Sequence, residues 1–358
     1  MLVIGLPKCT STYGVSSRDK DGEKDKRIQK TKNEWKGYIG LSETDAEAEQ
    51  TDKRGVVGSE KSEARRSARS FVGTGLDENR ILNHLVKASP RGFVSVGHSS
   101  VVFRVRFSSR PDAAYKPAEI KRPKGYLAEI AAYRLARCFD FRNVPPAVSR
   151  TFSRKTLRRG LTIGQTTVWP KLEERIDWDE DGSVRGAAIF WVPAMRRLNL
   201  ESRSEMRRWL KWLDIEGEVP EAMRPLAKDI SNMLSFDYLI GNGDRFSGGN
   251  IKGDMQGRFI YLRDHDLAFP QKIGDRVHRR IADRMLFAKR FSRVFFRKLS
   301  GLTREGLLRE LGRDPMSTAA PVLDERQIQG LFDRREALLS HITSLMQLHG
   351  EDRVLSFP

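Results

Sequence analysis

The spacing of the apolar residues changes once along this chain of 358 residues. Between about residues 90 and 192 they form short runs bounded by small or polar residues, which predicts β-strands. From about residue 206 onward they recur every three or four residues, which predicts amphipathic helices. The change predicts an α+β fold in which a β-rich first half is followed by a helical second half.

The first half contains one long helical pattern among the predicted strands. Residues 125–139 carry apolar side chains along one stripe and predict this helix. A shorter helix is predicted at 76–86, and strands are predicted at 93–96, 101–107, 113–117, 166–169 and 186–192.

The second half is predicted to be helical except for one hairpin. A glycine at position 241 follows the apolar helix of residues 226–240 and predicts a left-handed cap. Two short apolar runs around a glycine-rich turn predict the hairpin at 250–262. Further helices are predicted at 206–213, 279–299, 304–311 and 325–348.

The charge balance predicts anionic partners. The chain has 65 Lys and Arg against 47 Asp and Glu, a formal net charge of +18, which favours attraction to phosphates or acidic surfaces. The basic residues are spread along the chain, and no helix-turn-helix, zinc-finger or RRM pattern occurs. The sequence therefore argues against a nucleic-acid-binding protein. No Gly-Lys-Ser/Thr occurs, which excludes a Walker-type nucleotide site.

The N-terminal composition and the number of cysteines indicate how the chain is organised and which cellular compartment suits it. Residues 1–75 are polar and charge-dense and predict a flexible tail, because they offer too little apolar surface to offset their ordering entropy. Only two cysteines, Cys9 and Cys138, occur, which excludes a disulfide scaffold and favours a reducing compartment. No apolar stretch predicts a transmembrane segment, so we expect a cytoplasmic protein.

In the first half, three groups suit phosphoryl transfer from a nucleotide, which depends on alignment and charge neutralisation. A small-residue turn between two strands offers backbone N–H groups and hydroxyls to phosphates. Lys116 lies in an apolar strand and needs an anionic partner, for which a phosphate and Glu129 on the next predicted helix are the candidates. An ordinary hairpin turn, a solvated lysine and a solvated glutamate are the alternatives. The turn residues are Gly97, His98, Ser99 and Ser100.

Two acidic segments complete the pattern. The glycine-rich loop 241–250 holds Asp244, a candidate to accept the proton of an acceptor hydroxyl, and Asn250, whose amide oxygen suits Mg²⁺. The strand that follows ends at Asp264, our first candidate for a metal ligand, with Asp266 as the second. Plain turns with surface acids are the alternative.

These segments resemble the atypical kinases that unite phosphatidylinositol 3/4-kinase-like proteins, secretory-pathway casein kinases and HipA-like kinases. The resemblance rests on Lys116-Pro117, on Glu129, on IGNGDR at 240–245 with Asn250, and on DHDLAF at 264–269. It spans about residues 93–269 and implies a bilobal protein kinase-like fold. Its β-rich N-lobe with one key helix would cover 76–192, and its helical C-lobe 193–358.

The resemblance implies an ATP-dependent kinase that needs Mg²⁺ or Mn²⁺ and transfers the γ-phosphoryl group to a hydroxyl. Asp244 would be the catalytic aspartate and Asp264 would bind the metal, while Val192 and Met195 would contact adenine in the lobe connection. The acceptor stays open among an acidic protein, a lipid head group and a small molecule.

The chain departs from the family pattern in two ways. Asn250 follows Asp244 by six positions instead of five, with Gly248 and Gly249 as the pair that accommodates the extra residue, and Asp266 replaces a usual glycine. A catalytically inactive kinase-like binding module is therefore the main alternative, followed by a basic nucleic-acid-binding protein. Transfer of AMP instead of a phosphoryl group is also open.

Overall fold

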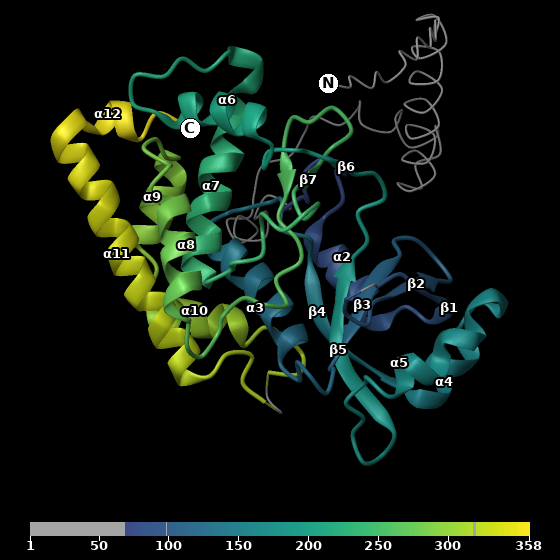
Figure 1. Cartoon of the computed structure of the whole chain (residues 1–358). Coiled ribbons are helices and arrows are strands. Elements are labelled where there is room, and N and C mark those ends of the chain that lie inside the picture. The colour runs from purple at the N-terminus through teal and green to yellow at the C-terminus, as the bar shows by residue number, and fades with distance from the viewer. Residues whose placement is uncertain (1–68, 98, 318–319) are drawn as a thin grey trace, which may run out of the picture. The chain divides into compact units, whose positions relative to one another are not determined.

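The computed structural model describes residues 69–97, 99–317 and 320–358, which belong to one compact unit of the chain (Figure 1). Most of the predicted tail, with Cys9, and the turn residue His98 lie outside the described residues. Residues 69–75, predicted as the end of the tail, pack onto the fold: Phe71 is buried and its ring lies 5.2 Å from that of Phe190. The folded part thus begins before residue 76.

A five-stranded antiparallel sheet forms the first half, in the order β1-β2-β3-β5-β4. Alternation of buried and exposed residues in β2 shows the period of two that the sequence predicted. Lys116 lies in β3, near the middle of the sheet, opposite Ala187 of β5. The strands are β1 (Pro90–Ser95), β2 (Phe103–Phe107), β3 (Ala113–Pro117), β4 (Ala147–Ser153) and β5 (Ser183–Phe190).

Helix α3 (Gly125–Cys138) packs against β4 and β5 and also against α10 (Arg304–Leu311) (Figure 1). Within its predicted apolar stripe, Ile130, Ala131 and Leu135 are buried, while Leu127 and Cys138 are partly exposed. The helix therefore lies between the sheet and the helical half, and it presents Glu129 from a buried position. Helix α2 (Glu78–Lys87) packs on β4 and β5 beside it.

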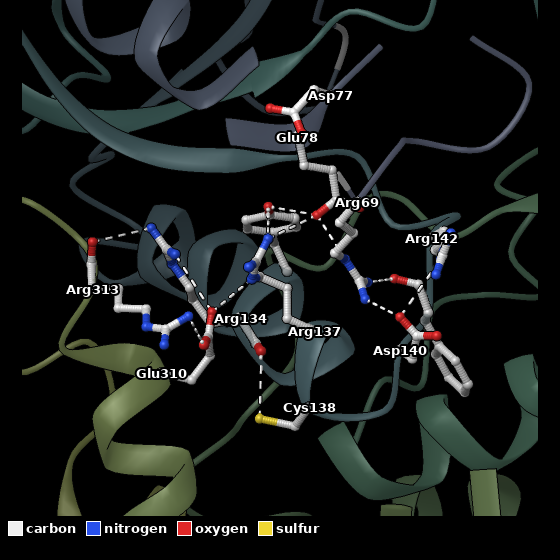
Figure 2. Close-up of polar contacts among 12 residues, drawn as sticks. Arg69, Asp77, Glu78, Arg134, Arg137, Cys138, Asp140, Arg142, Glu310 and Arg313 are labelled. Carbon is white, nitrogen blue, oxygen red and sulfur yellow. Dashed lines mark hydrogen bonds and ion pairs between the residues drawn. The ribbon is translucent and has the colours of Figure 1, made fainter. Parts of the chain in front are cut away.

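Charged side chains fix α3 to the helices on either side (Figure 2). Buried Glu78 of α2 accepts hydrogen bonds from Tyr133 (3.0 Å) and from Arg137 Nη1 (2.9 Å) of α3. On the other side, Arg137 Nε lies 2.8 Å from Glu310 Oε1 of α10, so one arginine joins three helices. Arg69 Nε adds a third donor to Glu78, at 2.8 Å.

The second half is mainly helical, as predicted. Helix α7 (Arg224–Ile240) is its buried centre and ends at Gly241, whose φ of 69° is the predicted left-handed cap. The other helices are α6 (Arg203–Leu213), α8 (Asp275–Met285), α9 (Arg293–Ser300), α11 (Glu325–His349) and α12 (Glu351–Val354). The predicted hairpin forms β7 (Lys252–Gly253) and β8 (Ile260–Tyr261), and β6 (Arg196–Arg197) pairs with β7.

Two predicted elements are wrong. Residues 166–169 are not a strand, because Ile163–Val168 form the 3₁₀ helix η2 and Trp169–Glu173 form α5, where Pro170 favours a helix start. The single helix predicted at 279–299 is two helices, because the side chain of Ser292 accepts the backbone N–H of Phe295 and starts α9 anew.

The sequence analysis also missed two elements of the first half, β4 and α4 (Arg154–Gly160). Helix α4 begins where the side chain of Ser153 accepts the backbone N–H of Thr156. The cap falls at the end of β4 and turns the chain away from the sheet. Helix α3 is nevertheless the one that carries a predicted site residue.

The close approach of β5 to β3 gives a first prediction. A Cβ at Gly186 would lie 2.5 Å from the carbonyl oxygen of Lys116, so Gly186→Ala must displace the strand that holds this lysine. We expect a loss of about 1 to 3 kcal/mol in the free energy of unfolding, measured by chemical denaturation. Gly164→Ala is the matched control, because a Cβ there meets nothing within 4 Å. Equal stability of the two variants would contradict the prediction.

Candidate active site

One cavity of about 670 Å³ gathers every predicted site residue that the structure describes. The sheet contributes the turn and Lys116, α3 contributes Glu129, and the second half contributes the acidic segments. The predicted residues in its lining are Gly97, Ser99, Ser100, Lys116, Glu129, Val192, Met195, Asp244, Asn250, Asp264 and Asp266. Groups separated by up to 170 positions thus share one site.

Lys116 is the centre of a buried ion cluster. Its Nζ donates to Glu129 Oε1 and lies 3.0 Å from Asp264 Oδ1. Burial alone lowers the pKa of Lys116, but the two carboxylates outweigh it and hold the pKa far above its ordinary value. The ammonium therefore stays charged at the edge of the cavity.

Glu129 is held from both halves of the fold. In addition to its contact with Lys116, Glu129 accepts a hydrogen bond from the backbone N–H of His265 at 3.0 Å. The ring Nδ1 of His265 lies 3.3 Å from Glu129 Oε2. Burial favours a higher pKa for Glu129, but the charge of Lys116 and contact with His265 lower it to about 2. Glu129 is thus an anion that aligns the lysine and ties α3 to the segment of Asp264. Sequence analysis did not identify the part played by His265, which is buried.

Asp264 adopts a backbone conformation that is rare for a residue with a side chain, with φ of 60°. Its Oδ1 faces Lys116, and its Oδ2 lies 2.8 Å from Arg263 Nη2. Burial raises the pKa of Asp264, but the charges of Lys116 and Arg263 overcome this and hold it well below its ordinary range. A strained carboxylate that stays ionised is typical of a functional position.

The loop after α7 presents Asp244 to the cavity in a fixed orientation. Ser247 Oγ donates to Asp244 Oδ1 at 2.6 Å, and Asn250 Nδ2 donates to its Oδ2 at 2.9 Å. Gly248 and Gly249 have φ of 43° and 102°, so the predicted glycine pair takes up the extra residue. Since the amide nitrogen of Asn250 faces Asp244, its amide oxygen is the atom left to bind a cation.

A second buried ion pair, which the sequence analysis missed, holds this loop in place. Asp237 of α7 accepts Arg245 Nε at 2.9 Å and Arg245 Nη2 at 3.0 Å, and also Asn242 Nδ2 at 3.0 Å. Arg245 Nη1 donates further to the carbonyl of Arg263. The segments of Asp244 and Asp264 are therefore joined through one arginine. An acid within the apolar helix 226–240 was the signal that could have revealed it.

The predicted turn closes one side of the cavity. A Cβ at Gly97 would lie 2.0 Å from the carbonyl oxygen of Ser100, so only glycine fits there. Buried Glu119 accepts the N–H of Val101 at 2.9 Å, and Arg175 donates to the carbonyl of Ser99 at 2.8 Å. These two residues, which sequence analysis also missed, hold the turn against the sheet.

Three further cations line the cavity beside Lys116, namely Arg122, Lys252 and Arg263. Arg122 Nη1 lies 3.0 Å from Asp266 Oδ2, so our second metal candidate is engaged with an arginine in this structure. Burial lowers the pKa of Lys252, and the charge of Arg263 adds to this effect. A lysine kept close to a like charge suits a polyanionic ligand.

The donor set fits a hard cation. Asp264 and Asn250 offer oxygen atoms, and Mg²⁺-like ions in phosphoryl-transfer sites use one or two carboxylates together with substrate phosphates. Within the described residues no group of three or more His, Cys, Asp and Glu is placed to hold a metal alone. A cation here would thus need ligand oxygens as well.

An apolar wall faces the charged floor of the cavity. It includes Val144, Ile189 and Val192, which are largely buried, and the partly exposed Ala114 and Met195. The segment from Trp191 to Met195 connects β5 to β6, so the predicted connection does line the cavity. A ligand that joins a flat apolar ring to a polar group the size of a phosphate would match the apolar wall and the charged floor of the cavity.

Known proteins share both sequence and fold with this chain. It is 24% identical to human glycosaminoglycan xylosylkinase over 295 residues, which cover 72% of this chain and 69% of that protein. It is 25% identical to mouse pseudokinase FAM20A over 312 residues, which cover 70% of this chain and 55% of that protein. No protein-family model matches the chain.

Two solved structures show the same fold. The Golgi casein kinase with Mn/ADP bound has a TM-score of 0.59 and 19% identity, and the match covers 78% of each chain. Hydra Fam20 with sugar has a TM-score of 0.57 and 16% identity, covering 80% of this chain and 95% of that one. The chain therefore has the α+β protein kinase-like fold of the Golgi casein kinase. The phosphatidylinositol kinase-like and HipA-like resemblances stay predictions.

The ion cluster predicts how stability depends on pH. Since the pKa of Glu129 falls from 4.5 to about 2 on folding, its contribution is complete above about pH 4.5 and is lost as the pH falls towards 2. Glu129→Gln should therefore reduce the slope of unfolding free energy against pH in this window by up to about 1.4 kcal/mol per pH unit. Denaturant titrations at several pH values measure the slope.

Glu221→Gln is the control for this experiment, because the Glu221 side chain is 93% exposed. We expect it to keep the slope of the parent protein. The assignment of Glu129 fails if both variants have the parent slope.

Proposed function

We propose that the chain is a kinase that uses ATP with Mg²⁺ or Mn²⁺ and transfers the γ-phosphoryl group to a hydroxyl of an acceptor. The observation that carries the proposal is the convergence of Lys116, Glu129, Asp244 and Asp264 on one cavity. The similarity to a Golgi casein kinase solved with Mn/ADP supports the choice of nucleotide and cation.

Lys116 would bind the nucleotide phosphates. Glu129 keeps its ammonium charged and directed along the cavity, while the turn at 97–100 offers backbone N–H groups above it. Val192 and Met195 would contact the adenine ring on the apolar wall. The arrangement fixes both ends of a nucleotide, which is the main requirement of phosphoryl transfer.

Asp264 and the amide oxygen of Asn250 would hold the divalent cation, which supplies charge neutralisation for the phosphates when bound. Asp244 would orient the acceptor hydroxyl and take its proton. Its two oxygens already accept hydrogen bonds from Ser247 and Asn250, which fixes the carboxylate plane for this task. Arg263 and Lys252 lie in the same lining and would stabilise charge on the transferred group.

A catalytically inactive kinase-like module is the second candidate. The 25% identity to mouse pseudokinase FAM20A favours it. The ion cluster and the fixed Asp244 argue for activity, because an inactive module has no need to keep an oriented base beside an ionised acid.

The acceptor and compartment belong to the proposal as well. A protein, a lipid head group and a small molecule remain the acceptor classes, and transfer of AMP remains open. No helix among the described residues is long and apolar enough to cross a membrane. The cytoplasmic location stays a prediction from the sequence.

Separate losses of binding and turnover test the proposed roles. We expect Asp264→Ala to abolish the thermal stabilisation by ATP with Mn²⁺, because it removes the proposed metal ligand. Asp244→Ala should keep this stabilisation but lower the rate of phosphoryl transfer by about 10² to 10⁴-fold. Thermal shift and mass spectrometry of modified acceptor or enzyme measure the two effects.

Asp352→Ala serves as the control, since the Asp352 side chain is 97% exposed. It should behave as the parent protein in both assays. Metal-dependent ATP binding without transfer in the parent protein, or the absence of metal-dependent ATP binding, would reject the kinase and favour the inactive module.

A further inference from the structure

Helix α8 carries a basic face that the proposed reaction does not use. Four arginines line a shallow hollow of about 570 Å³ together with Met206 and Phe287. They recur at helical spacing, so they project from neighbouring positions of one helix. They are Arg276, Arg279, Arg280 and Arg284. We refer to these four residues as the arginine face.

The arginine face adjoins the loop that presents Asp244. Arg280 Nη2 donates to the carbonyl of Gly243 at 3.0 Å, and the Arg284 guanidinium lies 4.3 Å from the ring centroid of Phe246. A Cβ at Gly243 would come within 2.8 Å of Arg280 Nη2, so helix and loop are in close contact. Asp244 lies between Gly243 and Phe246 in the chain, which places the face on the acceptor side of the site.

The arginine face forms no ion pair of its own. Within the described ranges, none of the four arginines is paired with a carboxylate, although Asp275 and Asp283 line the same hollow. Burial lowers the pKa of Arg284 and the charge of Arg280 adds to this effect, while the charge of Asp237 opposes it. The arginines of the α3 cluster, by contrast, are paired with Glu78 and Glu310 (Figure 2).

The dimensions of the face limit what it binds. Arg276 and Arg284 are two turns apart, which is about 12 Å along the helix axis. A single compact anion cannot reach both, whereas an extended peptide spans this distance with about four residues. Met206 and Phe287 add apolar surface in the same hollow, which suits the mixed side chains of a polypeptide.

We propose that the arginine face of α8 binds an acidic segment of a polypeptide acceptor and thereby places a nearby hydroxyl at Asp244. The part of the inference that concerns the reaction rests on the proposed function. The part that concerns binding does not rest on it, because recognition of the acidic segment requires only the arginines and the shape of the hollow.

The test uses Arg276→Gln/Arg279→Gln in the full chain, because these two arginines make no described contact with the loop of Asp244. The probes are a labelled serine peptide flanked by glutamates and the same peptide with glutamines. Fluorescence anisotropy measures their binding directly. We expect the acidic peptide to bind the parent protein, and the variant to bind it about ten- to hundredfold more weakly.

Arg158→Gln/Arg159→Gln is the matched control. It removes the same charge from two exposed arginines of α4, and it should bind the acidic peptide as the parent does. Equal binding of the two peptides, or an equal loss in both double variants, overturns the inference. Tighter binding of an RNA of equal charge through the arginine face also overturns it, in favour of a nucleic acid.

Kinetics separate this inference from the proposed function. If the peptide is phosphorylated, Arg276→Gln/Arg279→Gln should raise its KM and leave kcat and ATP binding unchanged. If the acidic peptide binds through the arginine face but the protein does not bind ATP with Mn²⁺, the docking surface is supported and the proposed kinase reaction fails. A fall in kcat without a change in KM or binding contradicts docking.

Discussion

The buried cluster of Lys116, Glu129 and Asp264 is the interaction on which the site depends, because it joins a strand, a helix and a loop from both halves of the chain. Removing Lys116 would leave two buried carboxylates without their shared cation, at a cost of about 3 to 5 kcal/mol. The three groups therefore impose one arrangement of the two halves. The cavity, its charged groups and the arrangement of the two halves therefore depend on the same contacts.

Two members of the cluster, Glu129 and Asp264, lie on segments that further charged pairs hold in place. On one side, the contacts of α3 with Glu78 and Glu310 fix the helix that carries Glu129 (Figure 2). On the other, Arg245 joins Asp237 to the carbonyl of Arg263, next to Asp264. The ionised groups are thus positioned by folding before any ligand arrives, which is the condition for electrostatic preorganisation.

Sequence patterns predicted most local elements and singled out residues that line one cavity, but they missed some local caps and the partners that lie far apart in sequence. Most of the sheet strands, the helical spacing of α3 and the glycine cap of α7 follow from periodicity and backbone freedom, which are local. The helix expected at 279–299 is interrupted by the cap at Ser292, and Pro170 favours a helix start where a strand was expected at 166–169. Glu119, Arg245 and His265 escaped notice because their partners lie far away in sequence.

The charge pairs of the site also bear on the energetics of ligand binding. Both oxygens of Asp264 contact protein cations, Lys116 at Oδ1 and Arg263 at Oδ2. A divalent cation held by Asp264, as proposed, would have to compete with these two protein cations for the carboxylate. Since an arginine that loses its carboxylate favours a phosphate as its next partner, Arg263, which lines the same cavity, would then be available to the phosphates of a nucleotide. The proposed binding of a metal–phosphate pair would thus redistribute charge pairs that the fold has already formed.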